Sequence, residues 1–328
     1  MSSPQVTSVM FPVQAGDVGA AVPFARLVQQ RGSGRMWMGQ SLRLETHHVF
    51  AALAGMGLRI PFGSSVVLSP LQHPFQAAVS ARSVAALSGH PYVAGFGPGS
   101  SEFQSTVSPA TRTRPVSSVR EYVSTVRTLL DGQPAHSTAG TFTTDGAGLT
   151  EFPHPGVEVG LGVLRPAMAR AAGRAADVAI TWLAPPTYIR DTLIPEMSAS
   201  AQAAGRTPPR VASVVHVAVA RPDRDLVQAA YTAVGPHLAS QHYTDMLRQG
   251  GVPADPAEPL QGAEQLVKSG VFVSGSPQEI AAQLADLHRH GVHEVILNVC
   301  GVCLTEGPGA ALRDLTAVLA AVDEAAHV

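Results

Sequence analysis

The sequence predicts a (β/α)8 barrel that forms a single domain over residues 1–328. Apolar strand-like runs alternate with helical patterns almost from end to end, there are eight such repeats, and the composition stays uniform along the chain. Eight strand-then-helix units of this kind favour a barrel over two Rossmann halves. Barrels of about 250 residues often carry insertions, and we expect them here after the fourth strand and before the eighth.

Each element follows from a local pattern. The strands are short apolar runs, predicted at Val6–Val13, Arg35–Gly39, Ile60–Leu68, Tyr92–Gly97, Val157–Leu161, Val178–Leu183, Arg210–Ala220 and Glu294–Val299. The helices lie at Val18–Gln30, His47–Ala54, Pro74–Leu87, Val116–Leu130, Pro166–Ala175, Tyr188–Ala204, Pro277–His290 and Ala310–Ala325. Two long connections interrupt this order, Pro98–Pro115 and Ser240–Gly275, and glycines and prolines make the second irregular.

The composition argues against several classes of function. The chain is 45% hydrophobic and 14% charged with a net charge of −2, and no basic run is interleaved with aromatic residues, so we expect no nucleic-acid partner. No apolar run reaches the roughly 18 residues of a membrane helix, and we see no signal-peptide pattern. With only two cysteines, a disulfide framework is not expected. We expect a soluble cytoplasmic protein.

The segment from Ile60 to Glu102 is the most informative for function. It reads as an apolar strand, a loop, a helix and a second apolar strand that ends in Gly95-Phe96-Gly97-Pro98-Gly99. Such a unit closes as a parallel pair whose strand ends share one edge of the sheet, where α/β proteins bind ligands. Glycines there let backbone amides approach a flat or anionic ligand. The alternatives are a plain turn or a dinucleotide fingerprint, and the position of Pro98 and a missing third glycine argue against the latter.

These residues, with further motifs in the same order, resemble the luciferase-like flavin and deazaflavin oxidoreductases. The matching elements are Gly63–Val67, His73-Pro74, Leu87–Gly89, Gly95–Gly99, Arg114, Arg120–Tyr122, Leu129–Gly132, Gly162, Pro166–Asp177, Thr181-Trp182, Ile194-Pro195 and Gly275–Val292. Trp37–Gln40 and Ile180–Trp182 resemble the F420-dependent subgroup most closely. The resemblance spans nearly the whole chain.

The resemblance implies a barrel that binds coenzyme F420 at its carboxyl-terminal mouth, with FMN as the alternative cofactor. It implies a non-prolyl cis peptide at Ser65–Val66 that supports the back of the ring, and a glycine-lined edge that contacts the ring, ribityl chain or phosphate. The implied contacts are Ser65, Val66, Gly97, Pro98, Gly99, Gly162, Val163, Leu164, Trp182 and, as a counter-charge for the acidic tail, Lys268. Trp182 has core filling as its alternative role.

The implied reaction is hydride transfer from reduced F420 to an activated C=C or C=N bond, with a proton delivered to the other end of that bond. Candidate residues for the proton step are Gln40, His47, Ser100 and Glu102, with His48 beside His47. Ser41 and Ser100 stand where the sugar-phosphate dehydrogenase branch has a histidine and a glutamate, which disfavours sugar-phosphate oxidation. Reductive tailoring of a natural product, such as a modified peptide, fits this subgroup.

Two other functions stay open, an FMN-dependent luciferase-like monooxygenase and a non-catalytic barrel that binds a small molecule. Family members often form homodimers, and the apolar stretch Val49–Leu58 is compatible with such an interface. Arg170 and Arg174 lie one helical turn apart, and we expect them on a solvated edge of an alanine-rich helix.

Other chemistry-bearing residues receive a structural interpretation. Cys300 and Cys303 follow an apolar strand and are not predicted to open a helix, so we expect small apolar thiols and no redox pair or zinc site. His288, His290 and His293 precede the last strand, so they belong at the bottom of the barrel, where residues usually serve stability. No metal site is predicted.

Overall fold

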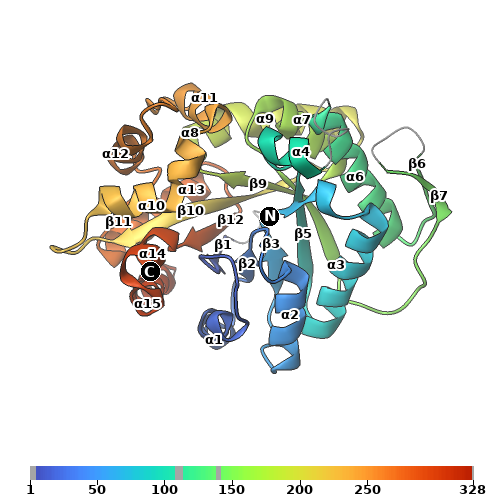
Figure 1. Ribbon diagram of the computed structural model, residues 1–328, viewed down its shortest axis with the longest axis horizontal. Helices are drawn as coiled ribbons and strands as arrows, with labels where there is room; N and C mark the ends of the chain where they lie inside the picture. Colours follow the sequence, from blue (N-terminus) through green and yellow to red (C-terminus); the bar gives the residue numbers. More distant parts are fainter. Residues whose placement is uncertain (1–4, 108–113, 138–141, 327–328) are drawn as a thin grey trace. The chain divides into compact units, whose positions relative to one another are not determined.

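The computed structural model describes residues 5–107, 114–137 and 142–326. The chain divides into two compact units. Unit 1 comprises Met1–Val13, Thr181–Pro195 and Val211–Val328, and unit 2 comprises Gln14–Ile180 and Glu196–Arg210. Figure 1 labels the elements of both units along the sequence.

Unit 2 contains a parallel sheet. Its strands are β2 (Met36–Met38), β3 (Phe62–Ser64), β5 (Tyr92–Gly97), β8 (Val157–Gly162) and the first residues of β9 (Val178–Trp182), side by side in that order, and β4 (Val67–Leu68) also pairs with β5. Every residue of β2, β3 and β5 is buried, as expected for parallel strands that are covered on both faces. A separate antiparallel hairpin joins β6 (Ala135–Ser137) to β7 (Thr144–Ala147).

Helices follow the strands of unit 2 in the predicted alternation (Figure 1). They are α1 (Val22–Arg31), α2 (Thr46–Gly55), α3 (Pro74–Ser88), α4 (Ser101–Val107), α6 (Pro115–Leu130), α7 (Pro166–Ala175) and most of α9 (Ile194–Ala203). Helix α3 packs against α2 and α6, and α6 packs against α7. Several begin at a proline, which suits the first turn because its missing N–H has no helical partner there.

In unit 1 the parallel strands are β11 (Val273–Gly275), β10 (Arg210–Val219), β12 (Glu294–Asn298) and β1 (Val6–Met10), side by side in that order. Its helices are α8 (Pro186–Tyr188), a π-helical turn at Ile189–Leu193, α10 (Leu226–Leu238), α11 (Gln241–Gln249), α12 (Pro259–Ser269), α13 (Pro277–Arg289), α14 (Cys300–Glu306) and α15 (Pro308–Ala325). The buried carboxylate of Asp314 accepts a hydrogen bond from Val219 N at 3.0 Å and pairs with Arg221 and Arg224, which fastens α15 to the end of β10.

The eight predicted strands are confirmed to within a few residues, and the third is split into β3 and β4 at Ser65–Val66. The prediction was wrong for Ser240–Gly275, which is not irregular: it holds α11, α12 and β11. It also missed α10, and Cys300 does open a helix, α14. The connection Pro98–Pro115 contains α4, while residues 108–113 lie outside the described residues.

Two expectations about surfaces can be compared with the structure. Most large side chains of the stretch Val49–Leu58 are buried within unit 2, and Met56 is the exposed exception at 60%. Core packing therefore explains most of its apolar character, and the homodimer stays a prediction. Within the described residues, no helix combines the length and apolar character needed to cross a bilayer.

Candidate active site

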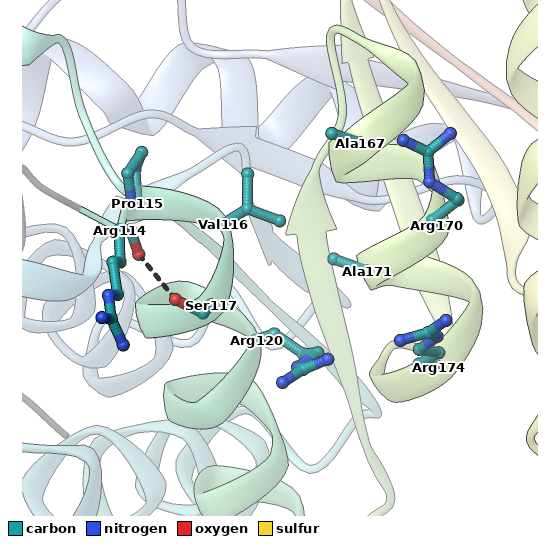
Figure 2. Close-up of a pocket in the computed structure, with 9 residues that line it drawn as sticks. All are labelled: Arg114, Pro115, Val116, Ser117, Arg120, Ala167, Arg170, Ala171 and Arg174. Carbon is teal, nitrogen blue, oxygen red and sulfur yellow. Dashed lines mark hydrogen bonds between the residues drawn. The ribbon is translucent and has the colours of Figure 1, made fainter. Parts of the chain in front are cut away.

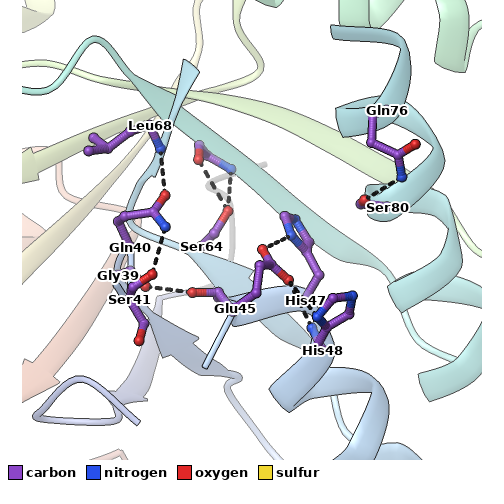
Figure 3. Close-up of polar contacts among 12 residues, drawn as sticks. Gly39, Gln40, Ser41, Glu45, His47, His48, Ser64, Leu68, Gln76 and Ser80 are labelled. Carbon is purple, nitrogen blue, oxygen red and sulfur yellow. Dashed lines mark hydrogen bonds and ion pairs between the residues drawn. The ribbon is translucent and has the colours of Figure 1, made fainter. Parts of the chain in front are cut away.

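The expected cis peptide bond lies between Ser65 and Val66, where β3 gives way to β4. Backbone bonds from β2 and the residues after it hold both sides of this bond: Ser65 N donates to Met38 O at 2.9 Å, and Gln40 N donates to Val66 O at 3.0 Å. The Gln40 side chain adds a second tie, because its Oε1 accepts from Leu68 N at 3.0 Å and its Nε2 donates to Ser41 O at 2.8 Å (Figure 3). Gln40 therefore fixes the bulge, and its amide is already engaged.

Glycines on the neighbouring strands make room for this bulge. A Cβ added to Gly97 would lie 2.7 Å from Val66 Cγ2, and one added to Gly162 would lie 3.5 Å from Val66 Cγ1. A Cβ on Gly95 would collide with the carbonyl of Ser64, whose hydroxyl donates to Gly95 O at 3.1 Å and accepts from Gly95 N at 2.9 Å. The predicted glycine edge thus has a structural use as well: the missing side chain of Gly97 leaves room for Val66, whereas a Cβ at Gly162 would only be in ordinary van der Waals contact with it.

The two faces of this sheet have different neighbours. Successive strand residues point to opposite faces, and the ring of Phe96 lies 5.2 Å from that of Tyr122 on α6, so Phe96 and Tyr92 face the helices. Gly95 and Gly97 therefore belong to the opposite face, together with the Val66 side chain. This second face is the interior side of the sheet, where a ring supported by Val66 would lie.

His47, predicted as a proton donor, lies on the helix-facing side. It belongs to the first turn of α2, and its ring is 5.9 Å from that of Tyr92. One turn later, Phe50 stacks on Phe62 at 4.5 Å, and Phe62 is in register with Tyr92. His47 is thus packed between α2 and the sheet, away from the face that carries Val66, and the expectation that it serves the reaction is not supported.

A carboxylate that the sequence reasoning missed holds His47 in place. Glu45 caps α2: its Oε2 accepts from His48 N at 3.0 Å, and its Oε1 lies 2.7 Å from His47 Nδ1 (Figure 3). Burial alone would raise the pKa of Glu45, but the bonds from His47 and His48 outweigh it and lower this pKa below its usual value. A glutamate two residues before a histidine is a common arrangement, so the sequence carried no distinctive signal for this pair.

The remaining unit 2 candidates lie after the ends of β5 and β8. Ser100 Oγ accepts from Phe103 N at 3.2 Å and so caps α4, and Glu102 is exposed on that helix. Gly99 has a left-handed φ of 77°. Val163 N donates to Ile180 O at 2.7 Å, which commits this amide to the sheet, so it is not free to bind a phosphate.

Pro98, Gly162 and Leu164 complete the predicted contacts in unit 2. Pro98 lines a cavity of about 260 Å³ together with His73 and Tyr122. Gly162 and Leu164 are half-buried around the end of β8, directly before α7 begins at Pro166. The helix start and the strand end thus come together where the cofactor phosphate is expected.

In unit 1, Trp182 lies at the end of β9 between two histidines that the sequence reasoning missed. Its ring stacks on His237 at 5.5 Å and meets His216 edge-on at 5.2 Å. Burial, with a smaller effect from His237, lowers the pKa of His216 to about 3, and burial lowers that of His237 to about 4. Within the described residues, Trp182 Nε1 and both ring nitrogens of His216 are buried without a hydrogen-bond partner, so these polar groups are candidates for ligand binding.

Lys268, also in unit 1, lies in the last turn of α12. Its side chain is 67% exposed and its ammonium group lies 3.6 Å from Glu264 Oε2. The structure therefore gives it a local partner and no support as a counter-charge for a cofactor tail.

The cysteine pair and the late histidines have structural environments. Burial raises the pKa of Cys300 to about 11 and raises that of Cys303 as well, the opposite of what a redox pair needs even though Cys300 opens α14. His288 Nδ1 lies 2.7 Å from Val292 O, and His293 Nδ1 accepts from Val211 N at 3.0 Å. Among the described residues, no group of three potential ligands is placed to hold a metal ion.

Comparison with known proteins decides the family. The family model described as luciferase-like monooxygenase matches residues 4–294. The chain belongs to this luciferase-like family. Its similarity to an F420-dependent glucose-6-phosphate dehydrogenase of Mycolicibacterium gilvum is 26% identity over 193 residues, which is 56% of this chain. The match spans about half, 54%, of that relative's length.

Solved structures of luciferase-like proteins show the fold. An F420-dependent secondary alcohol dehydrogenase in complex with an F420-acetone adduct has a TM-score of 0.74 at 16% identity, over 97% of this chain and 99% of that one. An F420-dependent tetrahydromethanopterin reductase from Methanopyrus kandleri has a TM-score of 0.75 at 16% identity, over 97% and 98%. The FMN-bound oxygenating constituent of a diketocamphane monooxygenase of Pseudomonas putida has a TM-score of 0.68 at 16% identity, over 96% and 97%. The predicted (β/α)8 barrel is thereby confirmed.

The luciferase-like barrel of this chain has residues that fit a flat cofactor. The Ser65–Val66 bulge is seated on Gly97 and Gly162, and Ser65 Oγ is buried without a partner among the described residues. The start of α7 follows the end of β8 and places a positive helix end there, which favours an anionic group, although Pro166 has no N–H and the amides of Met168 and Ala169 donate to Arg165 O. These features would hold a planar ring with a phosphate-bearing side chain, and the family contains both F420-dependent and FMN-bound structures.

Proposed function

We propose that this luciferase-like protein is an F420H2-dependent reductase that acts on an activated C=C or C=N bond. The observation that carries the proposal is the position of the Val66 side chain, which lies on the interior face of the sheet beside Gly97 and Gly162. The similarity to F420-dependent proteins supports the choice of cofactor. When bound, reduced F420 supplies a hydride and reacts poorly with dioxygen.

In this proposal the chain's own residues position the cofactor ring and shield its back face. Gln40 holds the bulge from one side through its bonds to Leu68 N and Val66 O, so that Val66 supports the back of the ring. The start of α7 would lie beside the phosphate of the bound cofactor, where its positive helix end favours an anion. Positioning of this kind accounts for most of the catalysis that a hydride transfer needs from its protein.

The reaction also needs a proton, because the acceptor bond gains a hydride at one end and a proton at the other. His47 lies on the helix-facing side of the sheet, the amide of Gln40 is engaged in structural bonds, and Ser100 caps α4 with a hydroxyl that does not give up its proton near neutral pH. We therefore propose Glu102, whose carboxylate is exposed on α4 just after the Gly97–Gly99 edge, as the group that passes a proton in from solvent. Replacement Glu102→Gln is expected to lower kcat by about 10²-fold while leaving the Kd for F420 unchanged, with Glu151→Gln as an exposed control.

The proposed substrate class depends on the absence of the histidine and glutamate that the sugar-phosphate dehydrogenase branch has at positions 41 and 100. Ser41 is buried and its hydroxyl caps Arg43 N at 3.1 Å. A serine hydroxyl is not a base near neutral pH, so this position offers no base for alcohol oxidation. We propose instead a small-molecule or peptide-derived acceptor, reduced in natural-product tailoring, and a cytoplasmic homodimer as the acting form.

A second candidate is an FMN-dependent monooxygenase, favoured by the family description and by the FMN-bound neighbour. Fluorescence titration of the purified chain with F420 and with FMN distinguishes the candidates. Tight binding of F420 with weak binding of FMN is the expected result. The reverse order overturns the reductase in favour of the monooxygenase, and binding of neither indicates a barrel without this cofactor chemistry.

A further inference from the structure

A groove rich in arginine lies between α6 and α7 of unit 2. It has a volume of about 450 Å³, and its lining includes Arg114 and Arg120 on one side and Arg170 and Arg174 on the other. Its other lining residues are small or apolar apart from one serine, and no carboxylate lines it in the described part of the chain. Figure 2 shows Arg120 and Arg174 reaching toward each other from the two helices. We call these four residues and the space between them the arginine groove.

Most of this charge is uncompensated. Arg170 pairs with Glu196 at 3.0 Å, but among the described residues no ion pair joins Arg114, Arg120 or Arg174 to a carboxylate. Other arginines of the same unit do have such partners: Arg127 pairs with Asp177, and Arg210 pairs with Glu158 at 2.8 Å. Like charges that share a groove repel one another, so this arrangement favours the binding of an anion.

The groove opens at the edge of the sheet that carries the candidate active site. Helices α6 and α7 follow β5 and β8, which pair in parallel with Phe96 opposite Leu161. Helix α7 begins at Pro166, four residues after β8 ends, and Pro115 at the start of α6 lines one cavity with Pro98, which directly follows β5. Both helices therefore begin close to this edge, and their positive ends add to the charge. Arg120 lies about one and a half turns into α6, and Arg174 about two turns into α7. The groove thus leads from the cofactor edge down the outside of the sheet.

We propose that the arginine groove binds a flexible chain with several carboxylate or phosphate groups, and that this chain is the phosphorylated oligoglutamyl tail of F420. The identity of the chain rests on the proposed function. Guanidinium groups suit this ligand because they form paired hydrogen bonds with carboxylates and phosphates. The apolar stems and the small residues Ala167 and Ala171 leave room for the backbone of the tail. The groove takes over the role that was predicted for Lys268.

The test compares intact F420 with its tail-less deazaflavin chromophore, by fluorescence titration of the full chain. The double variant Arg120→Ala/Arg174→Ala is matched with Arg26→Ala/Arg59→Ala, which removes the same charge from exposed positions outside the groove. The groove variant is expected to bind F420 about tenfold more weakly and the chromophore as well as the unmodified chain does. Added salt should weaken F420 binding more than chromophore binding. Circular dichroism and thermal unfolding confirm that both variants fold.

The outcomes separate the two proposals. If the groove variant binds F420 as well as its control does, the arginine groove is not a tail site, while the reductase can stand. If neither F420 nor the chromophore binds, the reductase is overturned and calorimetry with oligo-γ-glutamate and tripolyphosphate tests the groove alone. Binding of these anions that the groove variant loses and the control keeps supports an anionic chain from another source. If these anions do not bind, or if both variants lose their binding equally, the proposal that the arginine groove binds an anionic chain is overturned.

Discussion

A methyl carbon of Val66 occupies the space in which any side chain at position 97 would begin. A Cβ on Gly97 would lie 2.7 Å from Val66 Cγ2, closer than such carbons approach each other in proteins. The bulge that supports the proposed cofactor and the glycine at the end of β5 are therefore one packed unit.

Replacement Gly97→Ala is expected to destabilise the protein by about 1–3 kcal/mol, because overpacking forces Val66 to move. Urea unfolding measures this change. Gly156→Ala, where no atom lies within 4 Å of the added carbon, is the matched control and should have little effect. Adding Val66→Ala to Gly97→Ala should restore part of the lost stability. Additive losses in the double variant would show that the contact is not the cause.

The lowered pKa of Glu45 predicts a loss of stability in acid. A carboxylate whose pKa is lower in the folded than in the unfolded chain stabilises the fold above its usual value of 4.5, and this contribution disappears as the pH falls through the folded pKa. The melting temperature of Glu45→Gln should therefore depend less on pH between neutral pH and about pH 3. Exposed Glu151→Gln is the control. Parallel curves for Glu45→Gln and the unmodified chain would contradict the role of this pair.

His47 should matter for stability and not for the reaction. His47→Leu removes the partner of Glu45 Oε1 beneath α2, and a loss of about 1 kcal/mol in the free energy of unfolding is expected from that bond. Because His47 faces Tyr92 and not Val66, the Kd for F420 and the kcat of the folded variant should stay unchanged. A kcat that falls a hundredfold in a stably folded variant would show that His47 takes part in the reaction.

Both cysteines should react slowly with alkylating agents. Burial raises the pKa of Cys300 to about 11, so little thiolate is present at pH 8. Iodoacetamide labelling of the native chain, followed by mass spectrometry, should be much slower than labelling in denaturant. Cys300→Ser/Cys303→Ser is expected to keep full activity. Fast labelling together with loss of activity would support a redox role instead.

His216 predicts a second pH effect, in a higher range. Its pKa is about 3 in the folded chain against an ordinary value of 6.5, so the unfolded chain binds a proton first as the pH falls. Stability is therefore greatest above pH 6.5 and declines toward pH 3. His216→Phe, which cannot take up this proton, should show a flatter decline in melting temperature between about pH 7.5 and 5. An unchanged slope would show that His216 is not the group responsible.

The sequence predicted the strands well because each is an apolar run, and parallel strands buried on both faces need such runs. The prediction missed helix α10 because Gly235 and Pro236 lie inside it. It missed helix α12 because a proline, Pro259, begins it and is typical of loops. The cis peptide was predicted from the family resemblance and not from the residues themselves.

The candidate site was predicted less completely, because a sequence does not show which way a side chain points or which distant residues meet in the fold. Apolar patterning does not show which face of the sheet His47 serves, since that depends on the packing of α2 on Phe62 and Tyr92. Arg120 and Arg174 come from different helices, so only the packing of α6 on α7 brings them to one groove.

The arginine groove also affects how a ligand arrives. The chain as a whole carries a net charge of −2, yet it gathers four cationic side chains along one groove. An approaching anion is therefore attracted at this groove although the chain as a whole is weakly negative. Association of an anionic ligand should be fastest at low ionic strength and become slower as salt is added. The association rate should change more than the dissociation rate.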